Sequence, residues 1–351
     1  MSQRLGGLRR RLKEEGLDAI LISQAENRRY LSGFTGSAGF LLVSEQSAFL
    51  ATDFRYIEQA KAQAPAFEIF HIKGELSDWF AELVSSIDAK RVGFEADDIS
   101  FTSYRRLVAN LGKREMVPAG GMVESLRAVK YGEELALIQR AVAISDAACD
   151  EVVPALEMGM TEEDAAWLLE KSMREKGSQS LPFDIIVASG PNAAMPHHRP
   201  GDRALREGEP VVIDMGARVD GYCSDLSRTV CLGKEDDRFA KIYDLVLGAQ
   251  LTAIATIEAG MSGERADGMA RTVIEKGGHG EEFGHGLGHG VGLAPHELPR
   301  LGRGSTDIME DGMVFTVEPG IYLSGWGGVR IEDTVVLEQG RVKVLSNARK
   351  A

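Results

Sequence analysis

The chain has 351 residues, which exceeds the usual size of a single domain and predicts two domains. A hydrophobic fraction of 44% and a charged fraction of 26% are typical of a globular protein, and a formal net charge of −13 argues against a nucleic-acid partner. The apolar runs are all too short to cross a membrane, so we expect no membrane partner either.

The N-terminal segment and the cysteines both favour a cytoplasmic location. Residues 1–16 are basic but include acidic residues and lack the apolar stretch of a signal peptide, so they predict an amphipathic helix. Cys149, Cys223 and Cys231 form no CxxC pair, which predicts reduced, buried thiols and a chemistry that does not depend on cysteine.

The N-terminal part of the chain predicts a compact α/β domain, because short apolar runs alternate with helical patterns there. The runs expected to form strands are residues 17–23, 39–43, 48–52, 67–71 and 92–94. A proline- and glycine-containing segment follows them and marks the expected boundary. We therefore expect an N-terminal domain over residues 1–122 and a second domain over residues 123–351.

Two helices are expected at the start of the second domain. Apolar residues recur at spacings of three and four from Leu135 to Leu156, with Ser145 as the exception, which predicts a long amphipathic helix. Thr161, followed three residues later by Asp164, predicts the start of the next helix with Thr161 as its N-cap.

Residues 211–230 and 314–337 share one layout. In each segment an apolar strand ends in an acid, a glycine follows two residues later, and a turn leads to a strand with a second acid. Two such hairpins predict a pseudo-twofold domain with a site where its halves meet.

The first hairpin places two aspartates on one face. Asp220-Gly221 is a favoured two-residue turn, and it sets Asp225 opposite Gly216. Asp214 then points to the same face of the strand pair as Asp225. Two buried carboxylates repel each other, and a bound cation would relieve that repulsion. Taken alone, this hairpin also fits two aspartates that simply face water.

The second hairpin favours the metal site. Any odd-length loop centred on Gly325 sets Glu318 directly opposite Glu332. Pro319 cannot donate a ladder hydrogen bond, so we expect an edge or a bulge there. Two hairpins that each present paired acids indicate a shared site.

Six of the seven histidines lie between positions 197 and 296. His285 and His289 fall on a glycine-rich segment whose backbone can approach a metal or a substrate closely. We expect His289 to be a metal ligand and His285 to support it or to contact substrate.

His197 and His296 are further candidates in this histidine cluster. His198 should face away from the site, because adjacent side chains on an extended segment point in opposite directions. One imidazole with four carboxylates is a hard ligand set that suits Mn²⁺, Fe²⁺ or Co²⁺ better than a thiolate-rich zinc site. Two such ions could share a water molecule and lower its pKa toward neutrality.

The order of these motifs resembles the "pita-bread" metallopeptidases, and among them the Xaa-Pro peptidases, prolidase and aminopeptidase P, most closely. The resemblance covers nearly the whole chain. In the second domain it rests on IVASGPNAAMPH, VVIDMGA, GYCSDLSRT, GHGLGHGVG, TVEPGIY and GVRIED. In the first it rests on FTGSAG (34–39) and TDFRYIEQA (52–60), which are similar to the N-terminal domain of aminopeptidase P.

The resemblance implies an α/β (α+β) chain with a creatinase/prolidase-like N-terminal domain and a pita-bread domain that holds two divalent metal ions, most simply Mn²⁺, with Co²⁺, Fe²⁺ or Zn²⁺ as alternatives. It implies that Asp214 and Glu332 bridge both ions. Asp225 would complete the shell of one ion, and His289 with Glu318 that of the other. Glu318 would also act as general base.

The remaining roles come from the same resemblance. His197 and His296 would bind substrate and steady the tetrahedral intermediate. Arg330 would support Glu332, and Tyr322 would border the pocket. The substrate would be an Xaa-Pro peptide, and the assembly a homodimer.

Several readings stay open. The substrate preference can be that of an Xaa-Pro aminopeptidase or of an Xaa-Pro dipeptidase. A methionine aminopeptidase would share the five ligands but usually lacks such an N-terminal domain. A creatinase would share both domains but works without metal. A non-catalytic peptide-binding module on the same fold would be expected to have lost ligands, and all five are present.

Overall fold

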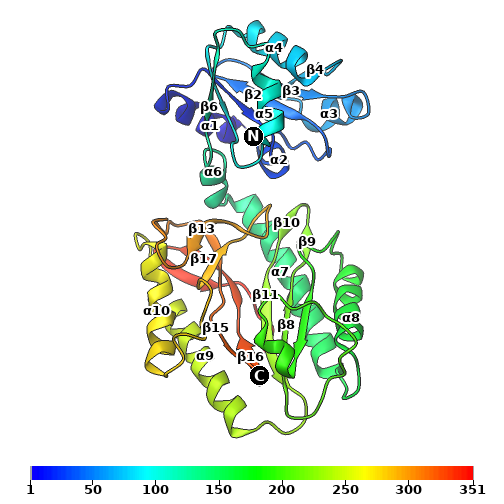
Figure 1. Ribbon diagram of the computed structural model, residues 1–351, viewed down its shortest axis with the longest axis vertical. Helices are drawn as coiled ribbons and strands as arrows, with labels where there is room; N and C mark the ends of the chain where they lie inside the picture. Colours follow the sequence, from blue (N-terminus) through cyan, green and yellow to red (C-terminus); the bar gives the residue numbers. More distant parts are fainter. Residues whose placement is uncertain (1, 351) are drawn as a thin grey trace. The chain divides into compact units, whose positions relative to one another are not determined.

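The computed structural model describes residues 2–350 and divides the chain into two compact units, Met1–Arg127 and Ala128–Ala351 (Figure 1). The boundary expected after residue 122 lies slightly before this division, which falls within helix α6 (Glu124–Ala128). No helix among the described residues is both long and apolar enough to span a membrane.

The first unit is built on a mixed sheet whose strands pair in the order β4–β3–β2–β1–β5–β6. β1 pairs antiparallel with β2 and parallel with β5, so the sheet changes direction at its centre. Its strands are β1 (Ala19–Ile22), β2 (Phe40–Ser44), β3 (Ala48–Thr52), β4 (Glu68–His71), β5 (Arg91–Phe94) and β6 (Glu115–Pro118). The five strands expected from the sequence are confirmed. β6 was not expected, because a four-residue strand that ends in proline gives little apolar signal.

The helices of the first unit include the predicted amphipathic one at its start. They are α1 (Ser2–Glu14), α2 (Ala25–Ser32), α3 (Ile57–Gln63), α4 (Leu76–Ser86) and α5 (Phe101–Val108). Trp79 and Phe80 of α4 and Leu107 of α5 are buried in a core with residues of β1, β3 and β5. This packing makes the first unit a compact α/β body, as expected.

The first half of the second unit packs two helices on an antiparallel sheet ordered β11–β8–β7. Its elements are α7 (Gly132–Val152), the 3₁₀ turn Val153–Ala155, α8 (Glu162–Glu175), β7 (Ile186–Ser189), the 3₁₀ turn Gly190–Ala194, β8 (Pro210–Met215), β9 (Arg218–Val219), β10 (Tyr222–Cys223) and β11 (Leu226–Cys231). The predicted long helix is confirmed as α7. Ser145 interrupts its apolar stripe because its hydroxyl lies 2.6 Å from that of Ser224, beside Asp225.

The second half repeats this plan with α9 (Asp237–Thr256) and α10 (Gly263–Lys276), which pack on a sheet ordered β13–β12–β14–β17–β18. Its strands are β12 (Gly288–Gly290), β13 (Glu297–Leu301), β14 (Val314–Val317), β15 (Gly320–Leu323), β16 (Gly327–Arg330), β17 (Asp333–Glu338) and β18 (Arg341–Val344). Within this unit the two helix pairs lie on opposite outer sides and the strands between them (Figure 1). This arrangement agrees with the expected pseudo-twofold domain.

Both predicted hairpin registers are confirmed. Val219 pairs with Tyr222 across the turn, where Asp220 and Gly221 both have positive φ, at 47° and 82°, as the favoured two-residue turn requires. The pairing resumes in the same register at Met215 and Leu226. A Cβ added at Gly216 would lie 2.4 Å from the Ser224 carbonyl oxygen, so the space beside this glycine is filled.

The second hairpin turns through a loop centred on Gly325, with Leu323 paired to Gly327. Val317 pairs with Asp333 in the same register, so Glu318 faces Glu332 as predicted. Pro319 lies where the strand is interrupted between β14 and β15.

The cysteines form no disulfide among the described residues. Cys149 and Cys223 are buried, as expected. Cys231 is partly exposed because it ends a strand, so its expected burial is wrong.

The predicted cap of α8 is confirmed, and it gives a first test of the fold. The Thr161 hydroxyl accepts a hydrogen bond from the Asp164 backbone N–H at 3.0 Å. Replacing Thr161 by alanine should lower the free energy of unfolding by about 1 kcal/mol, because one helix donor loses its partner. Urea denaturation of the metal-free protein measures this, and an unchanged midpoint would mean that the cap contributes nothing.

Candidate metal centre

The five expected metal ligands converge on one cavity. Ligand atoms of Asp214, Asp225 and Glu332 all lie within 4.8 Å of one another, and so do those of His289, Glu318 and Glu332. Glu332 belongs to both groups and therefore lies at the centre of the cluster. The structure thus brings together side chains that are up to 118 positions apart (332 − 214).

The backbone explains why acids point inward at these positions. Asp214 lies on β8, and Asp225 lies just before β11, where the first hairpin is interrupted. Glu318 and Glu332 occupy the matching interruption of the second hairpin. At an interruption the peptide groups leave the ladder, so the side chains can turn toward a common point.

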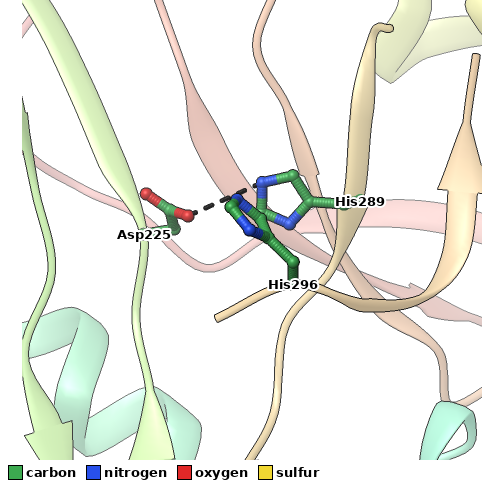
Figure 2. A group of neighbouring side chains, drawn as sticks. All are labelled: Asp225, His289 and His296. Carbon is green, nitrogen blue, oxygen red and sulfur yellow. Dashed lines mark ion pairs between the residues drawn. The ribbon is translucent and has the colours of Figure 1, made fainter. Parts of the chain in front are cut away.

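His289 enters the cluster from β12 and lies beside His296. Figure 2 shows both imidazole rings next to Asp225, which comes from the first hairpin. His289 Nε2 lies 3.1 Å from Glu318 Oε1 and 3.7 Å from Asp225 Oδ2. The rings of His289 and His296 meet edge to face at 4.1 Å, and Asp225, His289 and His296 form a third possible metal-holding group.

Burial and neighbouring charges shift the pKa values of the carboxyl groups in the cluster. Burial, together with the charges of Glu332 and Asp214, raises the pKa of Asp225 well above its usual range. Burial and the charges of Glu318 and Asp214 raise the pKa of Glu332 in the same way. Burial also acts to raise the pKa of Glu318, but the hydrogen bond and charge of His289 outweigh it and lower that pKa to about 2.

Two carboxylate oxygens show that the cluster fits a cation. Asp214 Oδ1 and Glu332 Oε1 are buried, and neither has a hydrogen-bond partner within residues 2–350. A buried acceptor left unpaired costs about 1–3 kcal/mol, and a charged one costs more. A divalent ion would satisfy both oxygens and offset the repulsion among four carboxylates. The oxygen-rich donor set therefore suits hard divalent ions.

Arg330 binds Asp214 directly and is linked to Glu332 through Ser227. Its Nη2 donates to Asp214 Oδ2 at 2.6 Å, and its Nε donates to the Ser227 hydroxyl at 2.8 Å. Ser227 in turn donates to Glu332 Oε2 at 2.8 Å. The guanidinium therefore reaches Glu332 only through Ser227, because β16, which carries Arg330, packs against β8.

His285 and Tyr322 lie together on the wall of the cavity, as expected. His285 Nε2 and the Tyr322 hydroxyl are 3.0 Å apart, and Arg330 donates to the same hydroxyl at 3.0 Å. Burial lowers the pKa of His285 and raises that of Tyr322, so both side chains are neutral near pH 7. Arg271 donates to the His285 carbonyl oxygen at 2.7 Å, which helps to hold the glycine-rich segment at His285 in place.

The cavity itself has a volume of about 740 Å³ and is lined by all five candidate ligands and by His197, His296 and His198. His197 and His296 are exposed to it, whereas His198 turns toward Glu162 at 2.7 Å. His198 was expected to face away from the site, but it also lines the cavity; it differs from His197 in that its Nε2 is paired with Glu162.

Sequence reasoning missed several residues around the cluster. Thr316 donates to Glu318 Oε1 at 3.0 Å and accepts from the His289 backbone N–H at 3.1 Å. Thr316 and Ser227 each lie two positions along the chain from a candidate ligand, Glu318 and Asp225, so extended-chain alternation could have indicated them. Arg300 lines the cavity and lies directly across the strand pair from His289.

A cavity in the second unit that gathers four carboxylates and an imidazole is suited to a metal-dependent hydrolase. The chain belongs to metallopeptidase family M24, which it matches over residues 136–339. Residues 4–129 match the creatinase/prolidase N-terminal domain. The expected fold class and family are confirmed.

Known proteins resemble the chain over nearly its whole length. An Xaa-Pro dipeptidase of Pyrococcus furiosus is 32% identical over 100% of this chain and 99% of its own. The structure of an Xaa-Pro dipeptidase from Bacillus anthracis aligns with a TM-score of 0.97 at 39% identity, covering 100% and 98% of the two chains. The structure of an X-Pro aminopeptidase from Thermotoga maritima aligns with a TM-score of 0.87 at 38% identity, covering 96% and 97%.

Proposed function

We propose that this metallopeptidase hydrolyses the peptide bond between an N-terminal residue and a following proline. Two divalent metal ions would be held by a set of five side chains: Asp214, Asp225, His289, Glu318 and Glu332. The observation that carries the proposal is the convergence of these side chains in one cavity that contains two buried, unpaired carboxylate oxygens. The catalytic centre would lie entirely within residues 123–351.

We propose the ligand roles that the family resemblance implies. Asp214 and Glu332 each carry a buried, unpaired carboxylate oxygen, which supports both as ligands that the two ions would share. Asp225 would bind one ion, and His289 with Glu318 the other. When bound, the ions would supply Lewis acidity that lowers the pKa of a water molecule and polarises the scissile carbonyl.

The protein's own groups would handle protons and substrate. Glu318 would accept the proton of the attacking water and pass it to the leaving proline nitrogen. His197 and His296, both exposed to the cavity, would donate hydrogen bonds to the substrate and to the developing oxyanion. Arg330 would orient Asp214 by its bond at 2.6 Å.

The other readings have less support. A methionine aminopeptidase usually lacks an N-terminal unit, and residues 4–129 match one here. A creatinase would not need the five ligands. A binding module without activity would be expected to have lost ligands, whereas all five meet in the cavity.

Among Xaa-Pro peptides we propose a dipeptide as the preferred substrate, on the basis of Arg300. This arginine lines the cavity across from His289 and is exposed. A dipeptide carries its carboxylate directly after the proline ring, close to the scissile bond, where Arg300 could pair with it. A tripeptide moves that charge one residue outward.

The substrate test compares an Xaa-Pro dipeptide with its C-terminal amide and with an Xaa-Pro-Yaa tripeptide. Wild-type protein should favour the dipeptide. Arg300→Met should raise KM for the dipeptide by about 10-fold to 100-fold, because the variant loses one hydrogen bond between charged groups. KM for the amide should change little. Arg265→Met, exposed on α10, serves as control. Preference for the tripeptide would instead indicate an Xaa-Pro aminopeptidase.

Manganese as the native ion, the homodimer and the cytoplasmic location belong to the same proposal. The hard donor set supports manganese over a thiolate-bound zinc. Light scattering in solution measures the oligomeric state, and a monomer at micromolar concentration would contradict the dimer.

A further inference from the structure

A buried carboxylate, Glu162, binds the segment that carries His197. Glu162 lies in the first turn of α8 and is 0% exposed. Its Oε1 accepts hydrogen bonds from the Ser189 backbone N–H and hydroxyl, both at 2.7 Å, and from Asn192 Nδ2 at 3.0 Å. Its Oε2 lies 2.7 Å from His198 Nε2. Glu162 thus contacts the end of β7, the turn after it, and His198.

The bond between Glu162 and His198 has a defined direction. An ionised carboxylate can only accept, so His198 Nε2 carries the hydrogen, whether the ring is neutral or charged. Burial acts to raise the pKa of Glu162, but the hydrogen bonds from His198, Ser189 and Asn192 outweigh it and lower that pKa, so the carboxylate is ionised near pH 7. The side chain of His198 is 14% exposed, which shields this bond from water.

Arg330 holds the same segment from the other side. Its Nη1 donates to the Pro196 carbonyl oxygen at 3.3 Å, while its Nη2 binds Asp214. His197 lies between Pro196 and His198, so both of its neighbours are anchored. His197 itself is exposed in the cavity.

We propose that Glu162 and His198 are positioning residues that act through His197. The pair fixes the backbone of residues 195–199 so that the His197 ring stays in the cavity, where it meets the substrate. This inference deepens the proposed function and rests on the substrate-binding role of His197. It gives His198 a role even though its Nε2 is paired with Glu162 and not with a candidate metal ligand.

Steady-state kinetics on the metal-loaded full chain test this role of the Glu162–His198 pair, here called the clamp. His198→Leu removes the donor and should lower kcat/KM for an Xaa-Pro dipeptide about tenfold, because misplacing a catalytic contact by about 1 Å can cost up to a hundredfold. His198→Gln keeps an amide donor and should recover activity to within about threefold of wild type. A leucine variant as active as wild type, or no recovery by glutamine, would overturn the proposal.

A double-mutant cycle separates action through His197 from a general structural effect. When His197 is already replaced by alanine, His198→Leu should lower kcat/KM by less than about a further twofold, because the effects of residues that act as a unit are not additive. The full tenfold loss in the His197→Ala protein would contradict the clamp. His71→Leu, at an exposed position on β4, is the matched control and should leave kcat/KM unchanged.

Hydrogen exchange gives a readout that does not depend on turnover. In His198→Leu, amides of residues 190–200 should exchange about tenfold faster, with no change in α7 or α9. Unchanged exchange of these amides in His198→Leu would overturn the clamp whatever the activity of the variant. If the amides exchange faster but the wild-type protein does not hydrolyse Xaa-Pro peptides, the clamp stands and the proposed substrate is wrong.

Discussion

Glu318→Gln should lower kcat about a thousandfold while the protein keeps its fold, because the variant loses the group proposed to carry the proton of the attacking water. The carboxylate is suited to this task, since His289 at 3.1 Å and Thr316 at 3.0 Å orient it. Glutamine has nearly the same shape and can still accept from Thr316. The loss should therefore appear in turnover while the variant remains folded.

The measurement is kcat at saturating Mn²⁺ with the bound metal determined in parallel, so that lost proton transfer is separated from lost metal. Glu310→Gln, at an exposed position, is the matched control and should keep wild-type turnover. A Glu318→Gln variant whose kcat lies within a factor of about three of wild type would refute the assigned role.

Glu332→Gln should have opposite effects on the two forms of the protein. Without metal, the buried Glu332 carboxylate faces other carboxylates and keeps one oxygen unpaired. Neutralising it should stabilise the metal-free protein by about 1 kcal/mol, or roughly 2–4 °C in Tm, because an unpaired buried charge is removed. With metal, the variant loses a proposed bridge, so the rise in Tm on adding Mn²⁺ should largely disappear.

Thermal denaturation with and without Mn²⁺ checks both signs in one experiment, and activity should fall more than about a hundredfold. Glu338→Gln, which removes only an exposed pair with Lys343, is the control and should change neither curve appreciably. If metal-free Glu332→Gln were less stable than wild type yet retained the full metal-induced rise, Glu332 would not be a ligand.

The hairpin geometry of the site could be predicted because short turns fix register. The Asp220-Gly221 turn and the loop centred on Gly325 each determine which residues face one another along their strands. Those registers alone brought Asp214 near Asp225 and set Glu318 opposite Glu332. Local chemistry therefore defined the acids of the cluster before any tertiary contact was known.

The contacts that orient the cluster could not be predicted in the same way. Arg330 binds Asp214, 116 positions away, because β16 packs on β8, and hairpin register does not determine which hairpins meet. The bond between Glu162 and His198 joins a helix to a loop and follows no strand or helix period. Such contacts depend on how the two halves of the second unit pack.

The metal content of active protein tests the central claim most directly. Protein purified without chelator should contain two divalent ions per chain, and its hydrolysis of an Xaa-Pro dipeptide should rise and fall with their occupancy during dialysis and Mn²⁺ replacement. Full activity in protein shown to be free of bound metal would contradict the proposed centre and every role assigned to its ligands.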